Sequence, residues 1–238
     1  SLCFGYGWNC LFAMTLPETT SAQRANILAV EEGLRALHLA GDVFAGYMLG
    51  LCCARRGALN QADTLFEACA QQGMDRAHLA RATAHLHFSR RPHGGEASSL
   101  AQEELASEWN HDIASEVIWV HAWAAIEKGY PDGYAVLGET LWDGIVRMQN
   151  LGGAFEYFVE GAKSGSGYSA YCAGLMLDRG FRTNGFGVEE MRSLLERALS
   201  DGCEQACYPL GVAYLRAQGG ERNLTRGLGL VRRAAYLG

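Results

Sequence analysis

The sequence pattern that decides the fold is GCEQACYPLGVAY at residues 202–214, followed by RRAAYLG at residues 232–238. Gly202 follows Ala198 by four places, and Gly238 follows Ala234 and Ala235 by four and three places. Small residues at these places before a glycine are typical of a helix that ends in a left-handed turn. The same ending recurs at Gly129, Gly165 and Gly202, and with the last glycine of the chain the spacings are 36, 37 and 36 residues. A period this regular predicts tandem structural repeats.

A second small residue follows each of these anchor glycines at a distance of nine residues. The pairs are Gly41 and Gly50, Gly73 and Ala82, Gly129 and Gly138, Gly165 and Gly174, and Gly202 and Gly211. A glycine inside a helix costs about 1 kcal/mol relative to alanine, so its recurrence indicates close helix packing. We therefore expect two antiparallel helices in each repeat. The first carries the small residue where the helices cross, the anchor glycine ends the second, and the repeats reach back to about residue 31.

The full pattern, Gly-x3-Ala-x3-Leu-Gly-x2-Tyr-x2-Gly followed by a helix ending Ala-Ala-x2-Gly, resembles the Sel-one-like repeat (SLR), a relative of the tetratricopeptide repeat. The resemblance is strong over residues 129–238 and looser over 31–88. Leu141 and Leu177 replace the usual tyrosine, and Ala82 replaces a glycine. The resemblance implies an all-α fold, a right-handed α/α solenoid of antiparallel helix pairs.

Two parts of the chain depart from the repeat. Residues 1–30 lack the pattern, and we expect them to form an N-terminal capping segment before a solenoid over residues 31–238. The 56 residues from Gly73 to Gly129 are too many for one repeat. We therefore expect an irregular insertion near residues 89–112, either an extra helix or a modified repeat.

Composition and charge limit the classes of function that this protein can have. The chain is 49% hydrophobic and 19% charged, which is typical of a folded protein. The net charge of −6 argues against a nucleic-acid partner, and no apolar run is long enough for a transmembrane segment. The first residue, Ser1, fits either a processed export signal or a trimmed chain.

The eight cysteines include no pair of C-x2-C motifs of the kind that binds zinc. Cys3 and Cys10 enclose a short loop, and we expect a disulfide between them, with two free thiols as the alternative. Cysteines 52, 53 and 172 fall in apolar helical patterns, where buried thiols are expected. The connectivity of Cys203 and Cys207 stays open, because spacing alone does not fix it.

No motif points to catalysis, a cofactor or a metal. Residues 161–165, GAKSG, resemble a phosphate loop but close a helix instead of opening one. His78, His85 and His87 share one stretch, but His85 and His87 do not lie on one helical face. Neighbouring acids such as Glu189 and Glu190 point apart on a helix. We therefore predict a protein without enzymatic activity.

The surface left for binding is the inner face of the first helices. In tetratricopeptide-like geometry Tyr47, Tyr171 and Tyr208 share one register toward a groove, although packing is an alternative role for these rings. Further residues predicted to face the groove are Glu139, Trp142, Asp143, Asp178, Arg179, Leu215 and Arg216. Trp142 lies one place beyond the usual core aromatic, which makes it the candidate anchor for a partner. Mixed acidic and arginine groups favour a protein ligand.

The resemblance implies a non-catalytic protein-binding function. Proteins similar to SLR repeats serve as adaptors, and some exported bacterial ones are immunity proteins that neutralise an antibacterial, lipase-like toxin delivered by type VI secretion. We expect a periplasmic immunity protein of this kind, with a cytoplasmic location as the alternative. The competing hypothesis is an envelope scaffold or signalling adaptor for a secretion or exopolysaccharide complex.

Overall fold

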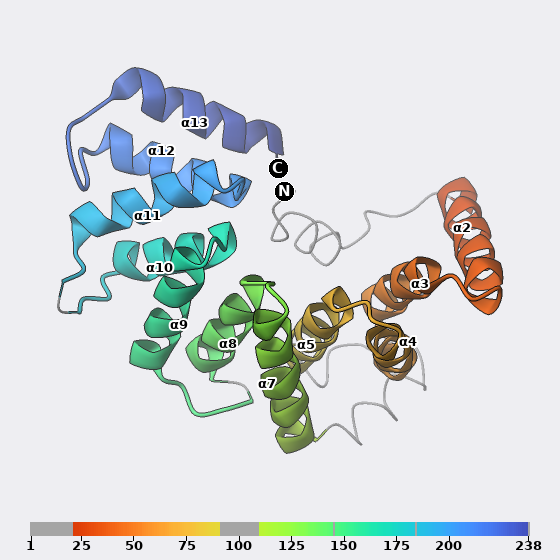
Figure 1. Ribbon diagram of the computed structural model, residues 1–238. Coiled ribbons are helices and arrows are strands. Elements are labelled where there is room, and N and C mark those ends of the chain that lie inside the picture. The colour runs from red at the N-terminus through yellow and green to blue at the C-terminus, as the bar shows by residue number, and fades with distance from the viewer. Residues whose placement is uncertain (1–20, 91–109, 145, 184, 238) are drawn as a thin grey trace. The chain divides into compact units, whose positions relative to one another are not determined.

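The computed structural model describes residues 21–90, 110–144, 146–183 and 185–237 (Figure 1). Within these ranges the ordered elements are helices, and Thr183 and Phe186 form an isolated bridge without a strand. The α-helices are α2 (Ser21–Leu39), α3 (Val43–Arg56), α4 (Leu59–Gln71), α5 (Arg76–Ser89), α7 (His111–Glu127), α8 (Asp132–Asp143), α9 (Leu151–Lys163), α10 (Gly167–Asp178), α11 (Val188–Ser200), α12 (Cys207–Leu215) and α13 (Leu224–Leu237). The 3-10 helix η1 (Glu204–Ala206) precedes α12.

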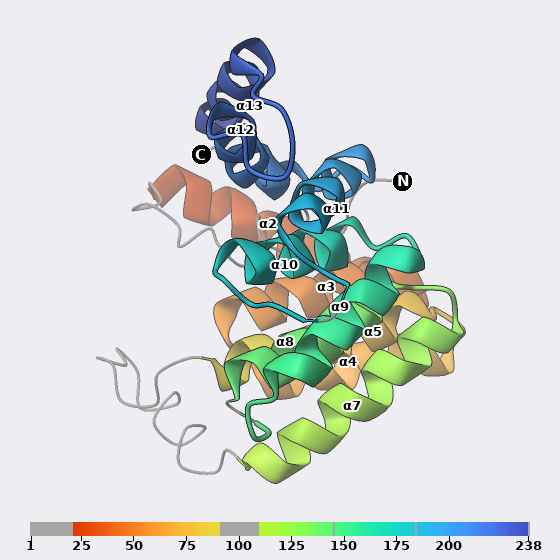
Figure 2. The ribbon, with the colours of Figure 1, turned by 90° about the vertical axis from the view of Figure 1, so that its left-hand side faces the viewer.

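These helices fall into two compact units, an N-terminal unit with α2–α8 and a C-terminal unit with α9–α13. In the N-terminal unit α3 packs on α4, and α5 packs on α7. In the C-terminal unit α10 packs on α11, and α12 packs on α13 (Figure 2). The predicted fold class, an all-α solenoid of antiparallel helix pairs, is confirmed. None of the described helices is long and apolar enough to cross a bilayer.

Anchor glycines end the second helices, as the sequence predicts. Gly73, Gly129, Gly165 and Gly202 have φ angles between +85° and +96°. At each one the next residue donates its N–H to a carbonyl five places back, for example Cys203 to Ala198. This is the Schellman arrangement, which satisfies carbonyls at the helix end and needs a left-handed residue.

The predicted close crossing at the second glycine is confirmed for Gly50, Gly174 and Gly211. A Cβ atom added to Gly50 would lie 2.7 Å from the Phe66 ring, and one added to Gly174 would lie 2.8 Å from Leu195 Cδ2. At Gly211 the same atom would lie 2.9 Å from Val231 Cγ2 and 3.0 Å from the carbonyl oxygen of Gly227. In each pair the residue that covers the glycine lies seven places before the anchor glycine.

The pair α5 and α7 shows how the repeat tolerates Ala82. The residue seven places before Gly129 is Ala122, and both alanines are fully buried. Where other repeats pair a glycine with a larger side chain, this repeat pairs two alanines. The added methyl group on α5 is offset by the smaller side chain on α7, so the side-chain volume at the crossing stays similar.

Both regions that depart from the repeat lie partly outside the described residues. The boundary expected at residue 30 falls inside α2, which runs without a break to Leu39 before Gly41. Residues 1–20, including Cys3 and Cys10, lie outside the described residues. The expected insertion near 89–112 also lies mostly outside them, between the end of α5 and the start of α7.

Candidate binding surface

Two of the predicted acidic residues meet an arginine at the surface of the N-terminal unit. Glu139 and Asp143 lie one turn apart on α8, and Arg90 follows the last residue of α5. Arg90 Nη2 lies 3.3 Å from Glu139 Oε2, and Arg90 Nε lies 2.5 Å from Asp143 Oδ2. The three side chains are 32%, 15% and 29% exposed, so water reaches them. The ends of two neighbouring first helices thus carry one mixed-charge cluster.

Trp142 adjoins this cluster in the last turn of α8, and its side chain is half-buried. Gly144 ends the helix with φ +68°, and Gln149 Nε2 donates to the Trp142 carbonyl oxygen at 2.7 Å. The N–H of Asn150 also donates to the Leu141 carbonyl. These bonds fix the end of α8 that carries the tryptophan, while its role as a partner anchor stays a prediction.

The three tyrosines of one register have different surroundings. Tyr47 is 4% exposed, and its ring lies 5.9 Å from that of Phe66. Burial raises its pKa to about 12. Tyr171 is half-buried, with a pKa raised to about 12 by burial, and Tyr208 is 61% exposed. The expectation that Tyr47 faces a groove is therefore wrong, because its ring is part of the core.

Other predicted residues lie at the ends of first helices in the C-terminal unit. Asp178 is the last residue of α10 and Arg179 follows it, whereas Arg216 follows α12, and all three are exposed. Leu215 is different: its Cγ lies 2.8 Å from where a Cβ on Gly227 would be, so it packs on α13 and not toward a groove.

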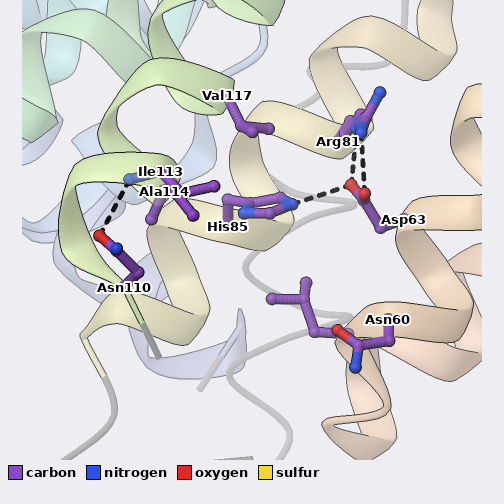
Figure 3. Close-up of a pocket in the computed structure, with 9 residues that line it drawn as sticks. Asn60, Asp63, Arg81, His85, Asn110, Ile113, Ala114 and Val117 are labelled. Carbon is purple, nitrogen blue, oxygen red and sulfur yellow. Dashed lines mark hydrogen bonds and ion pairs between the residues drawn. The ribbon is translucent and has the colours of Figure 1, made fainter. Parts of the chain in front are cut away.

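A cavity that the sequence analysis missed lies among α4, α5 and α7 (Figure 3). It has a volume of about 320 Å³, and Asp63, Arg81 and His85 form its polar wall. Arg81 Nε and Nη2 donate to the two Asp63 oxygens at 2.6 and 2.8 Å. His85 Nε2 lies 2.8 Å from Asp63 Oδ1 and donates to it, since a carboxylate only accepts. One sequence signal pointed to this place: His85 replaces the tyrosine of the repeat, three places after Ala82.

The electrostatics of this wall follow from its hydrogen bonds. Burial opposes ionisation of Asp63, but the hydrogen bonds and charges of His85 and Arg81 outweigh it and hold the pKa of Asp63 at about 2. Asp63 is therefore a carboxylate at neutral pH. Glu67 lies 3.5 Å from Arg81 Nη2 and is half exposed.

A pair of histidines lies in the same repeat. The Nδ1 atoms of His78 on α5 and His121 on α7 are 2.8 Å apart, and the rings stack with centroids 5.1 Å apart. Burial, followed by the charge of Arg81, lowers the pKa of His121 to about 4, and burial also lowers that of His78. One neutral ring donates to the other. Across the described ranges no group of three or more His, Cys, Asp or Glu residues is placed to hold a metal ion.

The described cysteines are free thiols, and Cys203 and Cys207 are not bonded to each other. Cys203 Sγ lies 3.0 Å from Gln205 Oε1, whereas Cys207 Sγ lies 3.5 Å from Glu204 Oε2. As expected, Cys53 and Cys172 are buried. Cys52 is only half-buried.

Comparison with known proteins identifies the fold. A solved Sel1 repeat protein from Oxalobacter formigenes superposes with a TM-score of 0.54 and 16% sequence identity, over 91% of this chain and 81% of that one. The chain has the Sel1 repeat fold. A protective antigen of uropathogenic Escherichia coli with an SLR fold, c5321, gives a TM-score of 0.46 and 18% identity, over 87% of this chain and about half (49%) of that one. No protein-family model and no curated protein matches the sequence.

Proposed function

We propose that this protein is a non-catalytic scaffold that binds another protein through the ends of α5 and α8. The observation that carries the proposal is the cluster of Arg90, Glu139 and Asp143 beside Trp142. Aromatic residues and arginine are enriched in protein interfaces, and partly exposed charges are typical of the polar rim around the buried centre. The cluster contains both signs of charge, which favours a folded or peptide partner over an anionic polymer.

Affinity capture from the source cell, followed by a binding measurement, tests this proposal. We expect Trp142→Ala to weaken binding of the captured partner by about 2 kcal/mol, which is roughly 30-fold in affinity. The circular dichroism spectrum of the variant should not change. Trp123→Ala is the matched control, because Trp123 is 36% exposed on α7 and packs edge-on against Tyr134, away from the cluster. Equal affinities for the two variants would move the interface away from the end of α8.

Within this class, we propose the narrower role of a periplasmic immunity protein that neutralises a secreted, lipase-like antibacterial toxin. The resemblance to SLR proteins and the net charge of −6 support this role. Capture of such a toxin, and protection of a toxin-sensitive strain by expression of this chain, are the expected results. Capture of polysaccharide or secretion machinery alone would favour the envelope scaffold instead.

The proposed export is tested separately. Cell fractionation of the full-length gene product is expected to place it in the periplasm, with Cys3 and Cys10 resistant to thiol alkylation. Recovery in the cytoplasm with both thiols reactive would reject the export proposal and leave the protein-binding proposal standing.

A further inference from the structure

The second helices of the repeats bury one stripe of residues, at four, seven and eleven places before the anchor glycine. Residues with this spacing lie on one face of a helix. All of them are buried in α4, α7, α9 and α11: Cys69, Phe66 and Ala62; Ala125, Ala122 and Ile118; Gly161, Phe158 and Ala154; and Ala198, Leu195 and Met191. The stripe is thus part of the core in each of these helices.

The partner of this stripe is the first helix of the same repeat. In the pair α3 and α4 the Phe66 ring covers Gly50. One turn further along α4, the Cys69 thiol donates to the Val43 carbonyl oxygen at 3.4 Å. In the pair α10 and α11 the same crossing recurs at Gly174. A first helix therefore keeps the stripe of its second helix out of water.

The stripe of α2 is exposed instead. Counted back from the anchor glycine, it consists of Leu37, Leu34 and Val30. Leu37 is 53% exposed and Val30 is 61% exposed, and Leu34 is only partly buried. On its other side α2 packs on α3, where the buried Glu31 pairs with Arg56 at 2.8 Å. In the described part of the chain α2 is therefore a second helix without its first helix.

Residues 1–20, which directly precede α2, have the composition of a buried segment. Eleven of them are apolar, and Glu18 carries the only charged side chain. Because such a cluster of apolar side chains is unfavourable in water, the segment needs a surface to cover it. The stripe reaches Leu37, about 24 Å from the start of α2, and sixteen residues span about 24 Å as a helix and more when extended. The segment is thus long enough to follow the whole stripe.

The register of this segment also fits the place of a first helix. Ala13 lies 21 residues before Leu34, which is the spacing between Gly174 and Leu195 in the pair α10 and α11. A small residue at this point lets two helices approach closely. Pro17 follows Ala13 by four places and ends a helix one residue earlier, whereas α10 ends four places after Gly174. The two lengths agree within one residue.

We propose that residues 1–20 of this chain pack along the exposed stripe of α2, in the place that a first helix takes in the other repeats, with Ala13 at the crossing with Leu34. α12 begins four places before its crossing glycine, which corresponds here to Asn9, so a disulfide between Cys3 and Cys10 is compatible with this packing. The stripe is thus an intramolecular docking surface, and α2 belongs to a complete repeat. The proposal is independent of the proposed partner interface at the ends of α5 and α8.

Photo-crosslinking in the full chain identifies what covers the stripe. A benzophenone amino acid in place of Leu37 is expected to crosslink to a peptide from residues 1–20, identified by mass spectrometry of the digested monomer. The same amino acid in place of Leu39 is the matched control, because Leu39 is 82% exposed on the same helix but lies outside the stripe. It should give less than a fifth of this crosslink. A crosslink to another copy of the chain or to any other segment, or equal yields at both positions, would overturn the proposal.

Hydrogen exchange tests the same packing without a bulky probe. In the full chain, amides of residues 9–16 should exchange at least tenfold more slowly than in a free peptide of residues 1–20. Leu37→Ser should speed their exchange at least fivefold, since the stripe loses an apolar contact, whereas Leu39→Ser should change it less than twofold. Exchange in the wild-type chain as fast as in the free peptide, or equal effects of the two variants, would contradict the packing.

Discussion

Equivalent positions of the repeat are filled differently in the two units. In α3 the ring of Tyr47 is buried against Phe66, whereas in α12 Tyr208 stands at the same register with Val231 in the place of Phe66 and is 61% exposed. In the same way the ring of Tyr214 contacts the guanidinium groups of two arginines, and His85 borders a cavity. The helical framework is thus shared, while the size of a neighbouring side chain decides whether a position is core, surface or pocket.

The largest expected effect separates the two tyrosines. Tyr47→Ala removes a buried ring and should lower the free energy of unfolding by about 3 kcal/mol, because a cavity replaces its contact with Phe66. Tyr208→Ala should change it by less than about 0.5 kcal/mol, since its ring is mostly in water. Urea denaturation followed by circular dichroism measures both. Similar losses for the two variants would contradict the difference in burial.

Close helix crossing in the C-terminal unit gives the next effect. Gly211→Ala places a Cβ 3.0 Å from the Gly227 carbonyl oxygen and should destabilise the protein by about 2 kcal/mol, because backbone cannot move aside cheaply. Gly229→Ala, in α13, places a Cβ that meets nothing within 4 Å and should stabilise the protein by up to about 1 kcal/mol. The opposite signs, measured by the same denaturation, distinguish packing from helix propensity. A stabilising Gly211→Ala would show that the helices do not meet closely.

The polar wall of the cavity should contribute to the stability of the fold. Asp63→Asn removes the charge that Arg81 and His85 share, and we expect a loss of about 1–2 kcal/mol, since Arg81 then lacks its main partner. Arg226→Ala in the C-terminal unit should lose less, about 1 kcal/mol, because its guanidinium is more exposed. Thermal unfolding of each variant, compared with the wild type, checks the order of the two losses. A larger loss for Arg226→Ala would contradict the prediction.

The smallest effect is a pH dependence restricted to one unit. The pKa values of His78 and His121 are lowered in the folded state, so the unfolded chain binds more protons, and stability should fall as pH drops from about 6.5 toward 4. We expect a loss of about 1 kcal/mol by pH 5, after a discount for partial exposure. The low pKa of Asp63 adds a second loss between about pH 4 and 2.

Hydrogen exchange at pH 7 and pH 5, corrected for the intrinsic rate, measures this difference segment by segment. All seven histidines lie in residues 38–121, so α5 and α7 should lose protection while α10–α13 do not. His121→Leu should remove most of the dependence. Equal loss of protection in both units would assign the effect to something other than the histidine pair.

Much of the fold follows from the sequence because glycine has a specific physical role at two points of each repeat. A residue at φ near +90° and a residue without Cβ at a helix crossing leave few alternatives, so helix ends and helix pairs were predictable. The register of Leu141 and Leu177 was recognisable for the same reason. The exposure of Tyr47 was not, because it depends on Phe66 in another helix.

The sequence by itself determined the repeat, its period, the helix boundaries at the anchor glycines and the places where two helices touch. Only the tertiary structure decided that Arg90 joins Glu139 and Asp143, and that Asp63, Arg81 and His85 enclose a cavity. The physical reason is that glycine constrains its own backbone, so the signal is local. Burial, ion pairing and cavity volume instead depend on side chains that come together only when separate helices pack.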